Sequence, residues 1–305
     1  MAHFSIETLW FRRFNQFGLV NARYSNVRLY MTCRKIQLTF FIMLSVTLQI
    51  YACEKNEFPY SDESRPLVKA LDACDISEVR RLLAENESPT DYANTDFTPI
   101  HYAAARGAVE ALALMLDISK DMELREKDVQ GRTPLFTAVN LHRVDVVQYL
   151  LKRGANANAT TLHGYTVLHM AAGEHEEALE IVELLVKAGA NVNATTPYGT
   201  SVLMSALNVG YEDVVEFILA QGADTNKQDL EQDTALHYAA YQSNPKIIIA
   251  LLRHGADPSM KNAKGLIPED VAAENNHLEV EKLLEQSRKH KSPNKTLQPT
   301  QKPRG

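Results

Sequence analysis

The chain has 305 residues, with 32 basic and 38 acidic side chains and a formal charge of −6. This length is enough to bury a core, and the acidic balance argues against nucleic acid as a partner, because phosphate binding needs a basic surface. Its three cysteines, Cys33, Cys53 and Cys74, fit neither a disulfide framework nor a zinc knuckle.

An uncharged apolar run, IQLTFFIMLSVTLQIY, occupies residues 36–51 and follows Arg34 and Lys35. It is marginal for a bilayer-spanning helix, which needs roughly 17 to 25 residues. A basic front end before a short apolar core is typical of a signal peptide. We therefore expect residues 31–52 to be a signal peptide or membrane anchor that starts at Met31.

The end of this run, Ile50-Tyr51-Ala52-Cys53, resembles a bacterial lipobox, although Tyr51 replaces the smaller residue usual at its position. The resemblance implies lipidation at Cys53 and an exported protein held in the periplasm or at the outer membrane. A secreted protein is the alternative. Membrane contact is expected through this N-terminal anchor only.

The segments outside the repeats are interpreted from composition. Residues 1–30 are read as an upstream extension, because the targeting pattern begins afresh at Met31; their aromatic and basic residues leave a membrane-surface segment as the alternative. Residues 53–65 have the composition of a linker. Residues 291–305, rich in Lys, Pro, Gln and Thr, predict a disordered tail.

One tetrad recurs through the middle of the chain: TPIH at 98–101, TPLF at 133–136, TVLH at 166–169, SVLM at 201–204 and TALH at 234–237. Successive starts are separated by 35, 33, 35 and 33 residues. A second pattern keeps the same phase: a leucine-rich pair, then Gly-Ala, then Asn or Asp, as in 150–156 and 251–257. A tetrad of this kind with a 33-residue period resembles the ankyrin repeat.

Each recurring residue also has a physical reason. Thr or Ser can cap the first helix of a unit, and Pro is tolerated directly after the cap. Alanine pairs allow close helix approach, and Gly can end the second helix in a left-handed conformation. The resemblance implies an all-α ankyrin solenoid over residues 66–290, with about seven stacked helix pairs and short β-hairpin fingers. Residues 66–94 and 265–286 are expected to cap its two ends.

Catalytic, metal and cofactor sites are not expected. His101, His169 and His237 never share a unit, and stacked units lie about 10 Å apart, which is too far for the ligands or bases of one site. The resemblance assigns these histidines hydrogen bonds between units. The run 174–177 lacks the spacing of a zinc motif. An enzyme hidden in the irregular segment 117–127 would need an activated nucleophile or an acid–base pair, which the segment lacks. Cys74 is expected to be a small buried side chain.

Ankyrin stacks bind partners in a groove between the fingers and the inner helices. The resemblance therefore predicts a non-enzymatic module that binds another protein, as an adaptor of the bacterial envelope or, alternatively, as a secreted effector or inhibitor. Some of the candidate contacts are expected merely to touch the neighbouring finger. The candidates are Phe97, Arg132, His163, Tyr165, Tyr198 and Tyr241, with Asn140, Glu174, Asn208 and Gln242 on the inner helices.

Overall fold

The structure, a computed structural model, describes residues 65–89, 97–119, 122–174 and 178–291. The chain divides into two compact units, residues 1–51 and 52–305, and every described residue lies in the second unit. The predicted extension, signal peptide and lipidation site at Cys53, and nearly all of the predicted linker and tail, lie outside the described residues.

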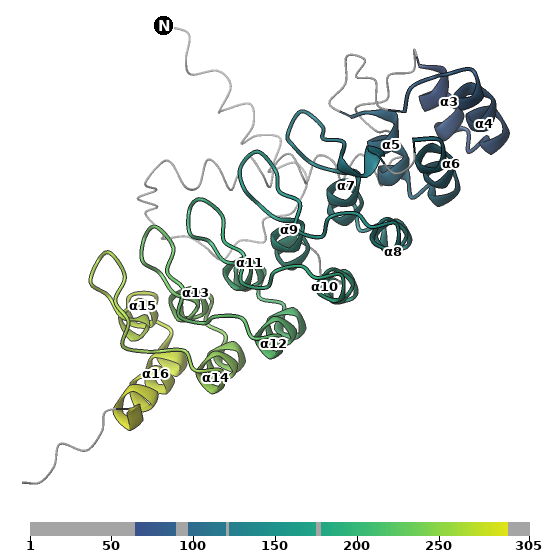
Figure 1. The fold of residues 1–305 in the computed structure, drawn as a ribbon. Helices are drawn as coiled ribbons and strands as arrows, with labels where there is room; N and C mark the ends of the chain where they lie inside the picture. The colour runs from purple at the N-terminus through teal and green to yellow at the C-terminus, as the bar shows by residue number, and fades with distance from the viewer. Residues whose placement is uncertain (1–64, 90–96, 120–121, 175–177, 292–305) are drawn as a thin grey trace, which may run out of the picture. The chain divides into compact units, whose positions relative to one another are not determined.

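The described residues form seven antiparallel helix pairs, as the repeat pattern predicts (Figure 1). One 3-10 helix, η1 (Met122–Arg125), follows the second pair. The pairs are α3 (Pro66–Asp72) with α4 (Ile76–Ala84), α5 (Pro99–Arg106) with α6 (Val109–Ser119), α7 (Pro134–Asn140) with α8 (Val144–Lys152), α9 (Val167–Glu174) with α10 (Ala178–Lys187), α11 (Val202–Val209) with α12 (Glu212–Ala220), α13 (Ala235–Gln242) with α14 (Pro245–Arg253), and α15 (Pro268–Glu274) with α16 (Leu278–Lys291).

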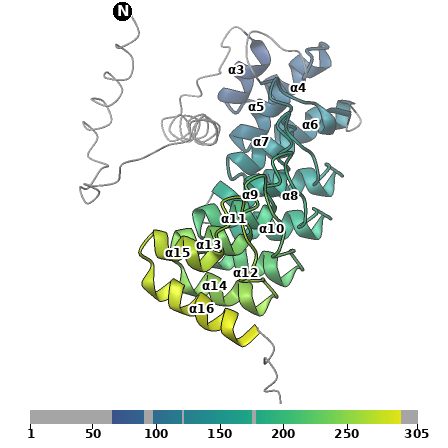
Figure 2. The ribbon, with the colours of Figure 1, turned by 90° about the vertical axis from the view of Figure 1, so that its left-hand side faces the viewer.

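Each pair stacks on the next in chain order, which gives two rows of helices (Figures 1 and 2). The first helices, from α3 to α15, contact one another in the inner row, and the second helices, from α4 to α16, do so in the outer row. Long-range contacts between neighbouring units therefore hold the solenoid together. No helix in the described ranges is both long and apolar enough to cross a bilayer.

Small residues set the spacing of the inner row. Ala103, Ala104, Ala239 and Ala240 have no exposed surface, so adjacent inner helices approach closely at these positions. The outer helices bury a branched apolar stripe, which in α8 consists of Val146, Val147 and Leu150. Thr133 caps α7 by accepting a hydrogen bond from the Phe136 amide at 3.3 Å, and Ser201 caps α11 in the same way at 3.2 Å from the Met204 amide.

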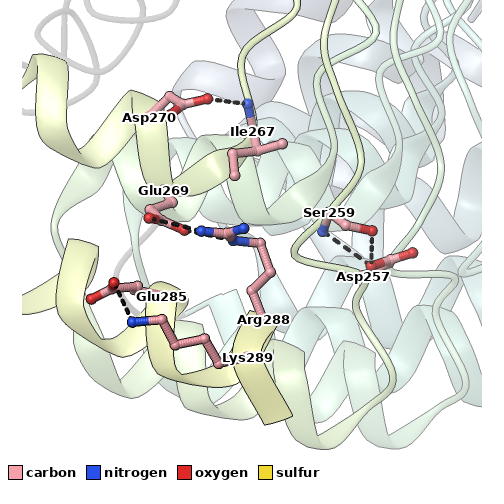
Figure 3. A network of polar contacts seen from close by, with 8 residues as sticks. All are labelled: Asp257, Ser259, Ile267, Glu269, Asp270, Glu285, Arg288 and Lys289. Carbon is pink, nitrogen blue, oxygen red and sulfur yellow. Dashed lines mark hydrogen bonds and ion pairs between the residues drawn. The ribbon is translucent and has the colours of Figure 1, made fainter. Parts of the chain in front are cut away.

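A polar network closes the C-terminal end of the stack (Figure 3). Arg288 on α16 donates two hydrogen bonds to Glu269 on α15, at 2.9 and 3.3 Å. Asp270 accepts the amide of Ile267 at 3.0 Å and so holds the start of α15. Charged side chains therefore join the two helices of the last unit and cap the start of α15.

The prediction that Cys74 is a buried side chain is wrong. Cys74 is exposed, and its backbone is left-handed, with φ of 52°. It lies in the turn between α3 and α4 and not on the buried face of either helix, so it contributes nothing to the core.

Candidate protein-binding surface

Five loops between successive units end in tips of the same construction. The tips are residues 128–132, 161–165, 196–200, 229–233 and 262–266, called here the first to the fifth tip. In each, the amide of the first residue donates to the carbonyl of the fifth, at 2.9 to 3.1 Å. The second and third loops also carry isolated antiparallel bridges, Thr160 to Thr166 and Thr195 to Ser201, and no longer strand occurs in the described ranges. The predicted fingers are thus present as very short hairpins.

Neighbouring tips bond to each other with one exception. The amides of Leu162, Leu230 and Ala263 donate to carbonyls of the preceding tip, at Gln130, Tyr198 and Glu231, over 3.0, 3.0 and 2.8 Å. The equivalent donor between the second and third tips would be residue 197, which is a proline without an N–H. Those two tips touch instead at Gly164, where an added Cβ would lie 2.4 Å from Cδ of Pro197.

Histidines join alternate inner helices to the following tip. The Thr166 amide donates to Nδ1 of His169 at 3.3 Å, so Nδ1 is an acceptor and Nε2 carries the proton, which it donates to the Thr200 carbonyl at 3.1 Å. Equivalent bonds run from His101 to the Arg132 carbonyl at 2.9 Å and from His237 to the Leu266 carbonyl at 3.0 Å. Burial lowers the pKa of His101 and of His169 to about 4. The predicted structural role is confirmed.

Asparagines form a second set of links, at the base of the loops. The Asn158 side chain donates to the Gly189 carbonyl at 2.9 Å and accepts the Asn191 amide at 2.8 Å. Asn193 makes the same two bonds to the next unit, at 3.1 and 2.8 Å, and so does Asn226. Asn158-Ala159-Thr160 and Asn193-Ala194-Thr195 match the Asn-X-Thr pattern of glycosylation sites. Their asparagines belong to this ladder.

Two of the predicted contacts, Phe97 and Arg132, are buried and so cannot present a free surface. Arg132 forms a 2.6 Å ion pair with Asp128, and its guanidinium lies 4.9 Å from the centre of the Phe97 ring. Both side chains therefore stabilise the first tip from within. Asn140 is also buried, because it faces into the stack of inner helices.

The remaining predicted residues lie at the surface or close to it. Tyr198 is 38% exposed, Tyr241 is 64% exposed and His163 is exposed, whereas Tyr165 is half-buried with its ring edge-on to His169 at 6.0 Å. Burial raises the pKa of Tyr165, and the nearby Tyr198 raises it further. The structure thus brings Tyr165 and Tyr198 together on adjacent tips.

The predicted inner-helix residues Asn208 and Gln242 are exposed and adjacent. Gln242 donates to the Asn208 carbonyl at 2.9 Å. The side chain of Glu174, and residues 175–177 of the acidic turn, lie outside the described residues. Within the described ranges, no group of three His, Cys, Asp or Glu side chains could hold a metal ion.

Sequence reasoning missed two features of this surface. Tyr238 on α13 is partly buried, donates to Asp229 at 2.8 Å and interacts electrostatically with Tyr165. An exposed apolar residue also stands second in every tip; these residues are Val129, Leu162, Pro197, Leu230 and Ala263. Their spacing of 33, 35, 33 and 33 residues was a readable signal, because its first three intervals are those between the tetrads that begin at residues 133, 166, 201 and 234.

Comparison with known proteins gives the same repeat. A family model described as ankyrin repeats matches residues 67–161, 118–196, 157–229 and 203–296. The human transient receptor potential cation channel subfamily A member 1 is 29% identical over 60% of this chain, and mouse inversin is 32% identical over 57%. The chain spans only 17% and 16% of the length of these two relatives.

A solved structure, the ankyrin repeat domain of Bcl-3, a member of the IkappaB protein family, superposes with a TM-score of 0.63 at 26% identity. The match covers 71% of this chain and 97% of that domain. Because the family model accounts for more than half of the sequence, and the helix pairs, tips and histidine bonds agree with it, the chain belongs to the ankyrin-repeat family.

Proposed function

We propose that the chain is a non-enzymatic module that binds another protein through the face that carries Tyr165 and Tyr198. The observation that carries this proposal is the juxtaposition of two partly exposed tyrosines on successive tips, where Tyr198 raises the pKa of Tyr165. Tyrosine joins a large apolar ring to one polar group, which is why it is enriched among interface hot spots.

The surroundings of this pair suit an uncharged contact. Residues 154–173 and 188–211, which include the second and third tips, contain no Asp, Glu, Lys or Arg. A partner that docks here therefore desolvates no full charge on these segments, which avoids a large energetic cost. We infer that the partner's contact at this point is apolar or aromatic, with hydrogen-bonding groups that reach the two phenols.

The binding proposal is tested by changing both tyrosines to alanine. Truncation of aromatic anchors near the centre of an interface typically costs roughly 2 kcal/mol or more, so the double variant should lose well over tenfold in affinity for a protein captured by the full chain. Tyr165→Phe with Tyr198→Phe then separates the contribution of the rings from that of the hydroxyl groups.

Glu183→Ala, an exposed change on the outer helix α10, is the matched control and should leave affinity unchanged. Thermal unfolding followed by circular dichroism must show that the double alanine variant stays folded. Undiminished binding by a folded double variant contradicts the proposal.

We further propose that this module is exported and anchored by lipid at Cys53 in a bacterial envelope, where it acts as an adaptor. The lipobox-like residues 50–53 after the apolar run support this location. Because stable anchoring takes two or more acyl chains, Cys53→Ala should shift the protein from the membrane fraction to a soluble or unprocessed form. Peptides from residues 1–30 in the native protein, or an unmodified Cys53 in the membrane fraction, would exclude this proposal.

A further inference from the structure

The exposed apolar residues at the second position of the tips form a regular row, named here the tip row: Val129, Leu162, Pro197, Leu230 and Ala263. Leu162 is 72% exposed, Leu230 65% and Val129 53%. Hydrogen bonds between tips, and the contact of Gly164 with Pro197, place successive tips side by side in chain order. The row lies on the outermost turn of each loop, whereas Tyr165 lies three residues further on, against His169.

The tip row offers apolar side chains but few free backbone groups. The amides of Leu162, Leu230 and Ala263 are already bonded to carbonyls of the preceding tips. An extended partner strand needs free donors and acceptors along the edge it joins, and a polyproline segment leaves its own backbone groups unpaired when it loses its water. An α-helix satisfies its backbone internally and therefore fits an apolar row of this kind best.

The spacing of the row also fits a helix. Successive helix pairs in a stack are separated by about 10 Å, and seven residues of an α-helix advance by about 10.5 Å. An apolar side chain at every seventh position of a partner helix would thus meet one tip after another. A strand returns a side chain to the same face about every 6.7 Å, which does not match this spacing.

Charge distinguishes one part of the row. The second and third tips carry no charged residue, and in the first tip Asp128 and Arg132 pair with each other. The fourth tip has Asp229, Glu231 and Asp233 and no basic residue, and Glu231 is exposed. The fifth tip has one charged residue, Lys264. A partner helix that follows the row therefore gains from one basic residue at the point where it passes Leu230.

We propose that the tip row is a docking surface for an amphipathic helix of the partner protein, with an apolar residue at every seventh position and a lysine or arginine beside the fourth tip. This inference rests on the proposed function, the binding of another protein, and assigns the partner's secondary structure and charge.

The test uses a displayed library of stapled helices of four heptads. Each helix has leucine at every seventh position, one arginine beside the third or fourth leucine, and randomised flanking residues, and it is selected against the full chain. Selected helices are then measured by fluorescence anisotropy. Leu162→Asp and Leu230→Asp should each weaken binding by about tenfold or more, because each change removes the burial of one leucine. Ile118→Asp, which changes a 55% exposed apolar residue on α6 away from the tips, should have no effect.

A reciprocal charge change tests the assignment of the fourth tip. Helices with the arginine changed to glutamate should bind the wild-type chain more weakly and recover with the Glu231→Lys variant. The proposal is overturned if no helix is selected, or if helices with leucine at every fifth position bind equally well. It is also overturned if a parallel selection from a linear, proline-rich library gives the only peptides whose binding requires Leu162 and Leu230. Loss of binding in the Tyr165 and Tyr198 variant alone would support the groove and reject the tip row, whereas loss in the leucine variants alone would do the reverse.

Discussion

At the scale of single residues, the buried histidines show how a titratable side chain can serve structure alone. His101 and His169 each accept one hydrogen bond at Nδ1 and donate one at Nε2, so the neutral ring is fully satisfied. A second proton would remove the acceptor at Nδ1 and place a charge in a dry environment. The low pKa of these rings therefore reflects a cost of charging and not a catalytic role.

This arrangement predicts a stability that depends on pH. The pKa of both histidines is about 4 in the fold, against 6.5 when unperturbed, so the unfolded chain binds protons first as the pH falls. The free energy of unfolding should be level above about pH 6.5 and decline between pH 6.5 and 4, by up to about 3 kcal/mol for each histidine.

Urea unfolding across this pH range measures the effect. His169→Gln should reduce the decline, whereas His163→Gln, which changes an exposed histidine, should not. An equal decline in the His169→Gln variant and the wild type would show that the carboxylates and not these histidines control acid stability.

At the scale of the structural element, the asparagine ladder explains why each loop base repeats so closely. Asn158, Asn193 and Asn226 use both atoms of the side-chain amide to bridge to the next unit. The ladder therefore transmits the position of one loop to the next without any apolar contact. A glycan on Asn158 or Asn193 would be attached to the same nitrogen that donates to the next unit.

Removal of one asparagine of the ladder should lower the free energy of unfolding. Asn193→Ala deletes two hydrogen bonds between units and should lower the free energy of unfolding by about 1 to 2 kcal/mol. Asn208→Ala is the matched control, since that side chain is exposed on the helix α11 and should change stability little. The denaturant midpoint of Asn193→Ala should be lower than that of Asn208→Ala. Equal midpoints would show that the ladder contributes no stability.

At the scale of the whole molecule, the repeat spacing together with the resemblance to ankyrin repeats predicted the helix pairs and their order. It did so because the tetrads and the Gly-Ala signals mark the same local structure in every unit. It could not predict that Arg132 is buried, because this depends on an ion pair with Asp128 and on the Phe97 ring, which no other tip reproduces. Cys74 was misplaced for a related reason, since a residue just beyond a helix end no longer follows the periodicity of that helix.

Because residue 197 is a proline, the joint between the second and third tips lacks the amide-to-carbonyl hydrogen bond that the other joints have. Each other pair of neighbouring tips shares an amide-to-carbonyl hydrogen bond, whereas the second and third tips meet at the contact of Pro197 with Gly164. The third tip is tied to α9 through His169, and the second tip is tied to the first through the Leu162 amide. Tyr165 and Tyr198 lie on opposite sides of this joint. The distance between their rings can therefore change without breaking an amide-to-carbonyl hydrogen bond between tips.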